Sequence, residues 1–155
     1  MPGRLDETRP FLPVNVALLT VSDTRDAAQD RSGNTLAELA GAAGHRIVVR
    51  RIVRDEHDQI AAQLRAWIAD PDIDVVISTG GTAAGALLPQ GQGITRLRGR
   101  WFDLAVPGLD QPVPTLPMFH PSFLLRTPER KREAWRDLLS LRARLDELLS
   151  AEGAG

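Results

Sequence analysis

Two polar segments follow apolar runs in the first half of the chain, and both have residue types that suit anion binding. Ser22-Asp23-Thr24 comes after the apolar residues 14–21, and Ser78-Thr79-Gly80-Gly81-Thr82 follows the β-branched run 73–77. A strand, a glycine turn and a helix start direct backbone N–H groups at an anion. A tight turn without a ligand is the alternative interpretation, because a lone glycine pair is weak evidence.

The elements that position these segments alternate between strand and helix. Apolar residues at positions 36, 39, 40 and 43 predict a helix over residues 32–43, with Asp30 or Ser32 as its cap. Residues 46–53 predict a second strand, placed at or near the sheet edge by Arg50 and Arg51. A helix over 56–69 and a third strand over 73–78 complete a parallel unit. Ligands bind at the carboxyl ends of such strands, so both polar segments should meet there.

The second half of the chain predicts smaller elements and one long helix. A short helix is expected over 83–88, and two short strands over 101–106 and 113–119 could form a hairpin. The last helix is predicted over residues 128–150, and its apolar stripe should pack on the sheet, with binding of a partner as the alternative. We therefore expect a three-layer α/β/α fold with a mostly parallel sheet. That stripe comprises Trp135, Leu138, Leu141, Leu145 and Leu148.

Composition narrows the class of protein. The 155 residues carry a net charge of −1, with 9 basic and 12 acidic residues in 1–80 (net −3) and 10 basic and 8 acidic in 81–155 (net +2). The chain has no cysteine, which excludes Fe–S clusters and cysteine-ligated zinc. No apolar run is long enough to cross a bilayer, and the first ten residues resemble no signal peptide. We expect a cytoplasmic protein without a membrane partner.

Residues 14–82 carry a series of motifs in a specific order. These are 15–24 (Asn-Val-Ala-Leu-Leu-Thr-Val-Ser-Asp-Thr), 30–36 (Asp-Arg-Ser-Gly-Asn-Thr-Leu), 43–45, 53–56 and 74–82. This half of the chain resembles the MoaB/Mog family of molybdenum cofactor biosynthesis. The resemblance implies an α/β fold that binds molybdopterin and, in the adenylyltransferase members, activates it with ATP. It also implies a homo-oligomer.

Transferred to this sequence, the resemblance implies a binding site for molybdopterin or a nucleotide phosphate. Hydroxyl and backbone N–H donors would bind phosphate or pterin, Asp23 or Asp30 could hold Mg²⁺ or a hydroxyl, and Asp23 is the metal candidate. The sequence departs from the family after Thr82, and 83–89 lack the acidic residue that the family uses, so we expect impaired adenylyl transfer. The expected site residues are Ser22, Asp23, Asp30, Ser32, Thr79, Gly80, Gly81 and Thr82.

The motifs of residues 80–146 resemble a different family from those of residues 14–82. The runs 93–102 (Gly-Ile-Thr-Arg-Leu-Arg-Gly-Arg-Trp-Phe) and 114–126, which contains His120-Pro121-Ser122, look like the carboxyl-terminal part of a family-four uracil-DNA glycosylase. That resemblance implies a catalytic His120 near a flipped base and DNA phosphates bound by Arg96, Arg98, Arg100 and Arg126. From the residues alone, His120 could equally be structural and the arginines a solvated face. The four cluster-binding cysteines and the water-activating motif of that family are absent.

Both resemblances overlap at the glycine turn, which predicts a fusion of two partial genes. One composite domain over 1–155 would then join a MoaB-like half, 14–82, to a glycosylase-like half, 83–150. Three functions follow as hypotheses: a MoaB-like protein that binds molybdopterin or nucleotide, with ATP and Mg²⁺ as cofactors; a DNA-binding glycosylase-like fragment; or a non-functional fusion product. The loops of both halves would crowd one edge of the sheet.

Overall fold

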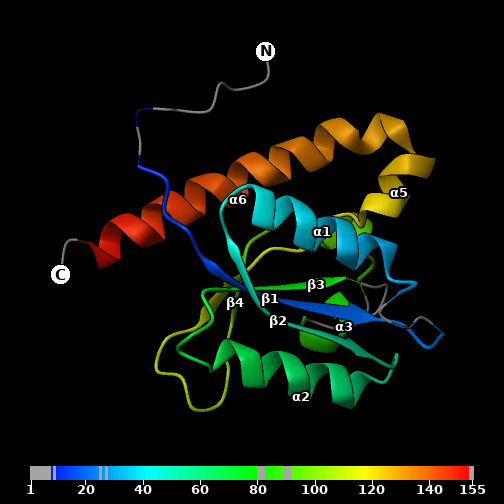
Figure 1. The fold of residues 1–155 in the computed structure, drawn as a ribbon, viewed down its shortest axis with the longest axis horizontal. Coiled ribbons are helices and arrows are strands. Elements are labelled where there is room, and N and C mark those ends of the chain that lie inside the picture. The colour runs from blue at the N-terminus through cyan, green and yellow to red at the C-terminus, as the bar shows by residue number, and fades with distance from the viewer. Residues whose placement is uncertain are drawn as a thin grey trace.

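A computed structural model describes residues 8, 10–24, 26, 28–79, 83–88 and 92–153. Its centre is a parallel sheet of order β2-β1-β3, made of β1 (Asn15–Val21), β2 (Arg46–Val53) and β3 (Val75–Thr79). Helices cover both faces, so the fold is α/β with three layers (Figure 1). The predicted edge position of the second strand is confirmed: β2 lies at an edge, and β1 lies between β2 and β3.

Strand β1 is buried on both faces, as its nearly continuous apolar sequence predicts. Ala17 and Leu19 belong to a core with Ile60, Leu64 and Trp67 of helix α2 (His57–Ile68). Alternate side chains of a strand point to opposite faces, so Leu18 and Thr20 lie on the other face of the sheet. Helix α1 (Arg31–Ala42) covers that second face, and α3 (Ala83–Leu87) packs beside α2 (Figure 1).

The predicted hairpin is present but shorter than expected. It pairs β4 (Phe102–Leu104) with β5 (Val113–Thr115) in an antiparallel sheet of two strands, separate from the parallel sheet. The structure adds α4 (Ile94–Leu97) and α5 (Pro121–Arg126), which lie where no helix was predicted. The predicted last helix divides into a 3-10 turn, η1 (Pro128–Arg130), and the 22-residue α6 (Lys131–Glu152).

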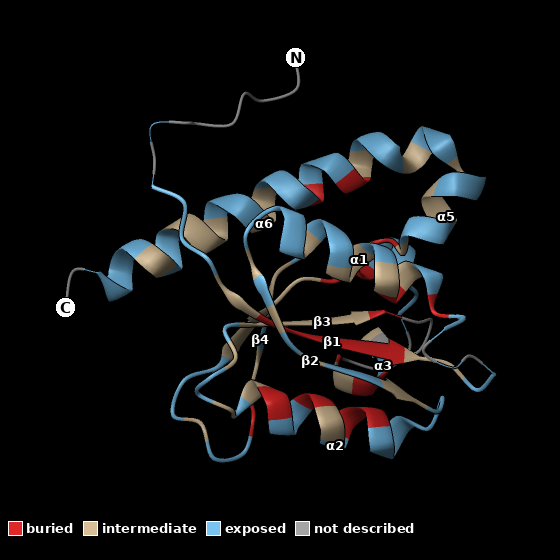
Figure 2. Ribbon diagram, viewed as in Figure 1, coloured by how far each residue is buried: buried red, intermediate tan, exposed pale blue. Residues whose placement is uncertain are grey.

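The apolar stripe of α6 was predicted to pack on the sheet, and this was wrong. Trp135 and Leu138 are each 45% exposed and Leu148 is 38% exposed, while the buried residues of the helix are Ala134 and Asp137. Figure 2 shows α6 mostly in the colours of exposed and intermediate residues, in contrast to α2. The helix turns a polar side inward because that side accepts hydrogen bonds from Arg98 and Trp101.

The attachment of α6 centres on Arg98, which follows α4. Its guanidinium bonds to both carboxylate oxygens of Asp137, to the Glu133 carboxylate at 3.0 Å and to the Glu133 carbonyl at 3.1 Å. These hydrogen bonds, first of all those to Asp137, raise the pKa of Arg98 above its already high value, so its charge is permanent. Trp101 adds a bond from Nε1 to the Ser140 hydroxyl at 2.8 Å.

Within the described ranges, no helix is both long enough and apolar enough to span a bilayer.

The backbone beside Arg98 yields a stability prediction. Gly99 has φ of +72°, and a Cβ placed there would lie 2.6 Å from Oδ1 of Asp137. Gly99→Ala should lower the free energy of unfolding by about 2–4 kcal/mol, through backbone strain of about 1–2 kcal/mol and displacement of the buried carboxylate. Urea denaturation measures this loss.

Gly108→Ala is the matched control, because Gly108 has φ of +91° but no atom within 4 Å of the added Cβ. This variant should lower the free energy of unfolding only by the backbone strain, about 1–2 kcal/mol. Equal losses in the two variants would contradict a steric role for Asp137.

Candidate functional site

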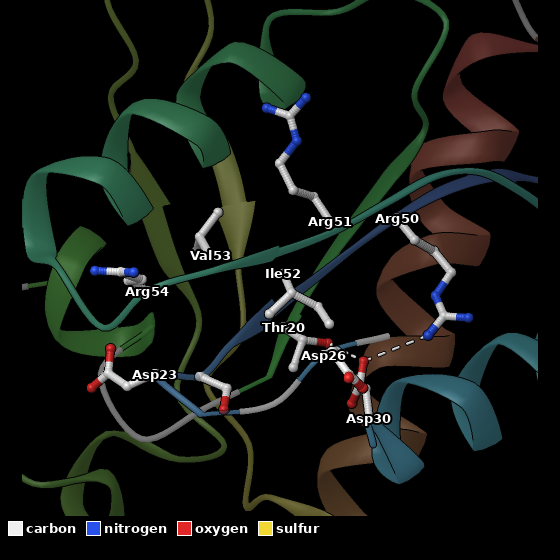
Figure 3. A pocket seen from close by; sticks show the side chains of 10 residues that line it. Thr20, Asp23, Asp26, Asp30, Arg50, Arg51, Ile52, Val53 and Arg54 are labelled. Carbon is white, nitrogen blue, oxygen red and sulfur yellow. Dashed lines mark hydrogen bonds and ion pairs between the residues drawn. The ribbon is translucent and has the colours of Figure 1, made fainter. Parts of the chain in front are cut away.

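An open depression of about 620 Å³ lies at the carboxyl ends of β1 and β2. It is lined by hydroxyls, aspartates and arginines, with two apolar side chains between them (Figure 3). The lining residues are Thr20, Ser22, Asp23, Asp26, Asp30, Arg50, Arg51, Ile52, Val53 and Arg54. All ten come from residues 20–54, so none of the described loop residues of the carboxyl-terminal half, which were expected at this edge, lines this depression.

Asp30 is the best-buried polar residue of the site, with 1% exposure. Its Oδ2 accepts a hydrogen bond from the Thr20 hydroxyl at 2.7 Å, and its Oδ1 accepts from the backbone N–H of Gly33 at 3.0 Å. The second bond makes Asp30 the N-cap of α1, one of the two caps predicted. A Cβ at residue 33 would lie 2.0 Å from Oδ2 of Asp30, so the carboxylate needs glycine there.

Arg50 supplies the positive charge nearest to Asp30. Its Nη2 lies 3.5 Å from Oδ2 of Asp30 and donates to Oδ1 of Asn34 in α1 at 2.9 Å (Figure 3). Arg51, the next residue of β2, extends to the other face of the sheet and bonds to Gln63 of α2. The arginines that suggested an edge strand therefore also tie β2 to the helices on both faces.

The loop after β1 is held against the end of β2. The backbone N–H of Ser22 donates to the Val53 carbonyl at 2.9 Å, and Oδ1 of Asp23 accepts from the Asp55 N–H at 2.9 Å. The Ser22 hydroxyl accepts a weak bond from the Thr24 N–H at 3.4 Å. Two predicted site residues thus lie together at the rim of the depression, and Asp23 is exposed to solvent.

Thr79 ends β3 beside Thr20, its register partner in β1. Thr79 is 7% exposed, and its hydroxyl oxygen has no hydrogen-bond partner within the described ranges; the same is true of the Ser78 hydroxyl. Buried hydroxyls nearly always have a partner. These two stand directly before Gly80, Gly81 and Thr82, predicted site residues that lie outside the described ones.

The remaining predicted site residues are not gathered in this depression. Ser32 is the second residue of α1, and no metal-binding group of three His, Asp or Glu side chains occurs in the described part of the chain. Asp26, Arg50, Arg51 and Arg54 line the site but were not predicted as site residues. The position of β2 next to β1 was the signal that could have identified the three arginines.

The residues expected at DNA lie in α4, α5 and the segments beside them. His120 caps α5: its Nδ1 accepts from the Ser122 N–H at 3.1 Å and lies 2.8 Å from the Ser122 hydroxyl. Arg98 directs its donors to Asp137 and Glu133, and Arg100 lies over the Phe102 ring at 5.6 Å. Arg96 and Arg126 are exposed. Their roles at DNA stay predictions.

These features define an α/β domain with polar loops at the carboxyl edge of a parallel sheet. Residues 17–87 match the family described as "Probable molybdopterin binding domain". All residues of the main hydrophobic core fall within the same range. The amino-terminal half of the chain is therefore MoaB-like, as its motifs predicted.

Relatives support this assignment over the same half. The chain is 44% identical over 86 residues to "Molybdenum cofactor biosynthesis protein B" of Escherichia coli (strain K12), covering 51% of each chain. It is 40% identical over 73 residues to the protein of that name from Staphylococcus epidermidis, covering 45% of this chain and 42% of that one. The chain spans about half the length of these relatives.

A solved structure titled "Crystal structure of Molybdenum cofactor biosynthesis protein B" aligns with a TM-score of 0.49 and 28% identity. The alignment covers 60% of this chain and 58% of that chain. None of these relatives bears on the glycosylase resemblance, so the fusion of two partial genes stays a prediction.

The two threonines at the ends of β1 and β3 give a matched pair of predictions. Thr20→Val removes the hydroxyl that donates to the buried Asp30 carboxylate, and should lower the free energy of unfolding by about 1.5–3 kcal/mol. Thr79→Val removes a buried hydroxyl without a described partner, and should leave stability unchanged or slightly higher. Urea denaturation of both variants measures the difference, and equal losses would show that Thr79 has a structural bond.

Proposed function

We propose that the chain is a MoaB-like molybdenum cofactor biosynthesis protein that binds molybdopterin or a nucleotide through its phosphate. The observation that carries this proposal is the buried hydroxyl of Thr79 at the end of β3, which has no hydrogen-bond partner among the described residues and lies beside Thr20, the partner of Asp30. A bound ligand would give that hydroxyl a hydrogen-bond partner. The similarity of residues 17–87 to probable molybdopterin binding domains supports a pterin as the ligand.

Charges around the depression suit a phosphate on the β2 side. Arg50, Arg51 and Arg54 line it, and an arginine guanidinium can bind phosphate oxygens through two parallel bonds. Arg50 and Arg51 already have partners in the helices, which leaves Arg54 at the rim as the cation that we assign to the ligand. The hydroxyls at the ends of β1 and β3 would then bind the uncharged polar part of the molecule.

We also propose that Mg²⁺ reaches the site on the phosphates of ATP. Mg²⁺ commonly uses one or two carboxylates and completes its shell with phosphates and water. Asp23 suits this role, because its carboxylate is exposed at the rim. Adenylyl transfer is not part of the proposal, since residues 83–88 contain no acidic side chain to replace the one that the family uses.

Calorimetric titration with molybdopterin, and separately with ATP and Mg²⁺, tests the proposal. Thr79→Val should weaken binding about fivefold to tenfold without loss of stability, because it removes one hydrogen bond. Asp23→Asn should weaken binding of ATP only when Mg²⁺ is present. Asp103→Asn, an exposed carboxylate in β4, is the control and should have no effect.

An absence of heat with both ligands would contradict the proposal. So would binding that is equal in the unchanged chain, Thr79→Val and Asp23→Asn.

A further inference from the structure

Thr20 lines the depression with a hydroxyl group whose hydrogen already has a partner. The hydroxyl donates to Oδ2 of Asp30 at 2.7 Å, and Thr20 is only 5% exposed. A threonine hydroxyl has one hydrogen to donate and two lone pairs that accept. No described residue donates to those lone pairs. Because Asp30 takes the hydrogen, the Thr20 hydroxyl can serve a ligand only as an acceptor.

The carboxylate of Asp30 fixes this direction of the bond. Both of its oxygens are acceptors, and Oδ1 is already bonded to the Gly33 N–H at 3.0 Å. Figure 3 shows the Thr20 and Asp30 side chains turned toward each other, with Arg50 joined to the same carboxylate. If the Thr20 hydroxyl turned its hydrogen to a ligand instead, a buried carboxylate oxygen would lose its hydrogen bond, which is costly.

The inner end of the depression therefore differs from its rim. Ile52 is the register partner of Thr20 in β2 and adds an apolar side chain beside that acceptor. At the rim lies the exposed Arg54, whose guanidinium offers donors only. The oxygens of a phosphate need such donors, and the Thr20 hydroxyl has none to give. The inner end suits an uncharged group that carries its own hydrogen.

We propose that the Thr20–Asp30 pair selects an N–H or O–H donor on the uncharged part of the ligand and rejects phosphate at the inner end. Asp30 determines this specificity through Thr20. The inference rests on the proposed function and gives the ligand a direction, with a pterin ring or a nucleoside at Thr20 and its phosphate at Arg54. Sites that leave a buried polar group unpaired with the wrong ligand discriminate strongly.

Asp30→Asn tests the proposal because it reverses the bond to Thr20. The amide oxygen keeps the Gly33 N–H, so the amide NH₂ faces Thr20 and donates to it. The hydrogen of the Thr20 hydroxyl then turns toward the ligand. Asparagine is as good an N-cap as aspartate, so the variant should retain its circular dichroism spectrum. Thr20→Ser is the matched control, since it keeps both the hydroxyl and the carboxylate.

Calorimetric titration with three compounds measures the preference of the site. Adenosine and 6-hydroxymethylpterin carry N–H and O–H donors without phosphate, whereas the oxygens of inorganic pyrophosphate act mainly as acceptors. Asp30→Asn should weaken binding of the uncharged compound by at least about fivefold, and pyrophosphate should bind equally well or more tightly. Arg54→Ala should weaken pyrophosphate alone, and Thr20→Ser should bind like the unchanged chain. Which uncharged compound binds more tightly distinguishes a pterin from a nucleoside.

The outcomes separate this inference from the proposed function. Equal weakening of both kinds of compound by Asp30→Asn would indicate a merely structural role and overturn the inference, as would an unchanged preference. Binding of pyrophosphate without either uncharged compound would also overturn it, while phosphate binding itself would stand. No heat with any of the three compounds would contradict the proposed function and this inference together.

Discussion

The buried carboxylate of Asp30 is the interaction on which the candidate site depends. It accepts bonds from the Thr20 hydroxyl of β1 and the Gly33 N–H of α1, and it faces the Arg50 guanidinium of β2. Three consecutive elements of the chain thus meet at one carboxylate. Burying a charge is costly unless hydrogen bonds and an opposite charge compensate it, so the partners of Asp30 are constrained as strongly as Asp30 itself. Thr20, Asp30 and Arg50 all line the depression, so these contacts help to set its shape.

Two different types of junction hold the molecule together. The amino-terminal half is joined by apolar packing of β1, α2 and α3, with Leu19 and Ile60 fully buried. The attachment of α6 instead relies on polar contacts from Arg98 to Asp137 and Glu133 and from Trp101 to Ser140. Polar contacts have strict geometry but contribute less net free energy than a packed core. This difference explains how a long helix can be fixed in position while its apolar residues stay exposed.

The parallel sheet could be predicted from the sequence. The residues of β1 are apolar along its length, and the alternation of strand and helix restricts a parallel sheet to few arrangements. The cap at Asp30, one of the two candidates, followed from the same pattern. The apolar period of α6 predicted a helix correctly but not which side it buries, because Arg98 and its two acidic partners determine that side. The spacing of apolar residues within one helix carries no information about a contact between residues 98 and 137.

Part of the site was also hidden from sequence reasoning for a physical reason. Arg50 and Arg51 look alike in the sequence, yet alternation along β2 sends one toward Asp30 and the other toward Gln63. Only the pairing of β2 with β1 brings Arg50 to the depression beside Asp30. Short helices such as α4 and α5 escaped notice because four to six residues carry too little periodicity to distinguish them from loops.

The core drawn from residues 17–87 has a consequence for how the molecule is made. Every described residue of that core, and every described strand of the parallel sheet, precedes α6 in the chain and is therefore synthesised before it. Domains generally fold as units, amino-terminal parts first, during synthesis. The first half can therefore assemble on its own while the remainder of the polypeptide is still in the exit tunnel, and Arg98 with its acidic partners joins a scaffold that already exists.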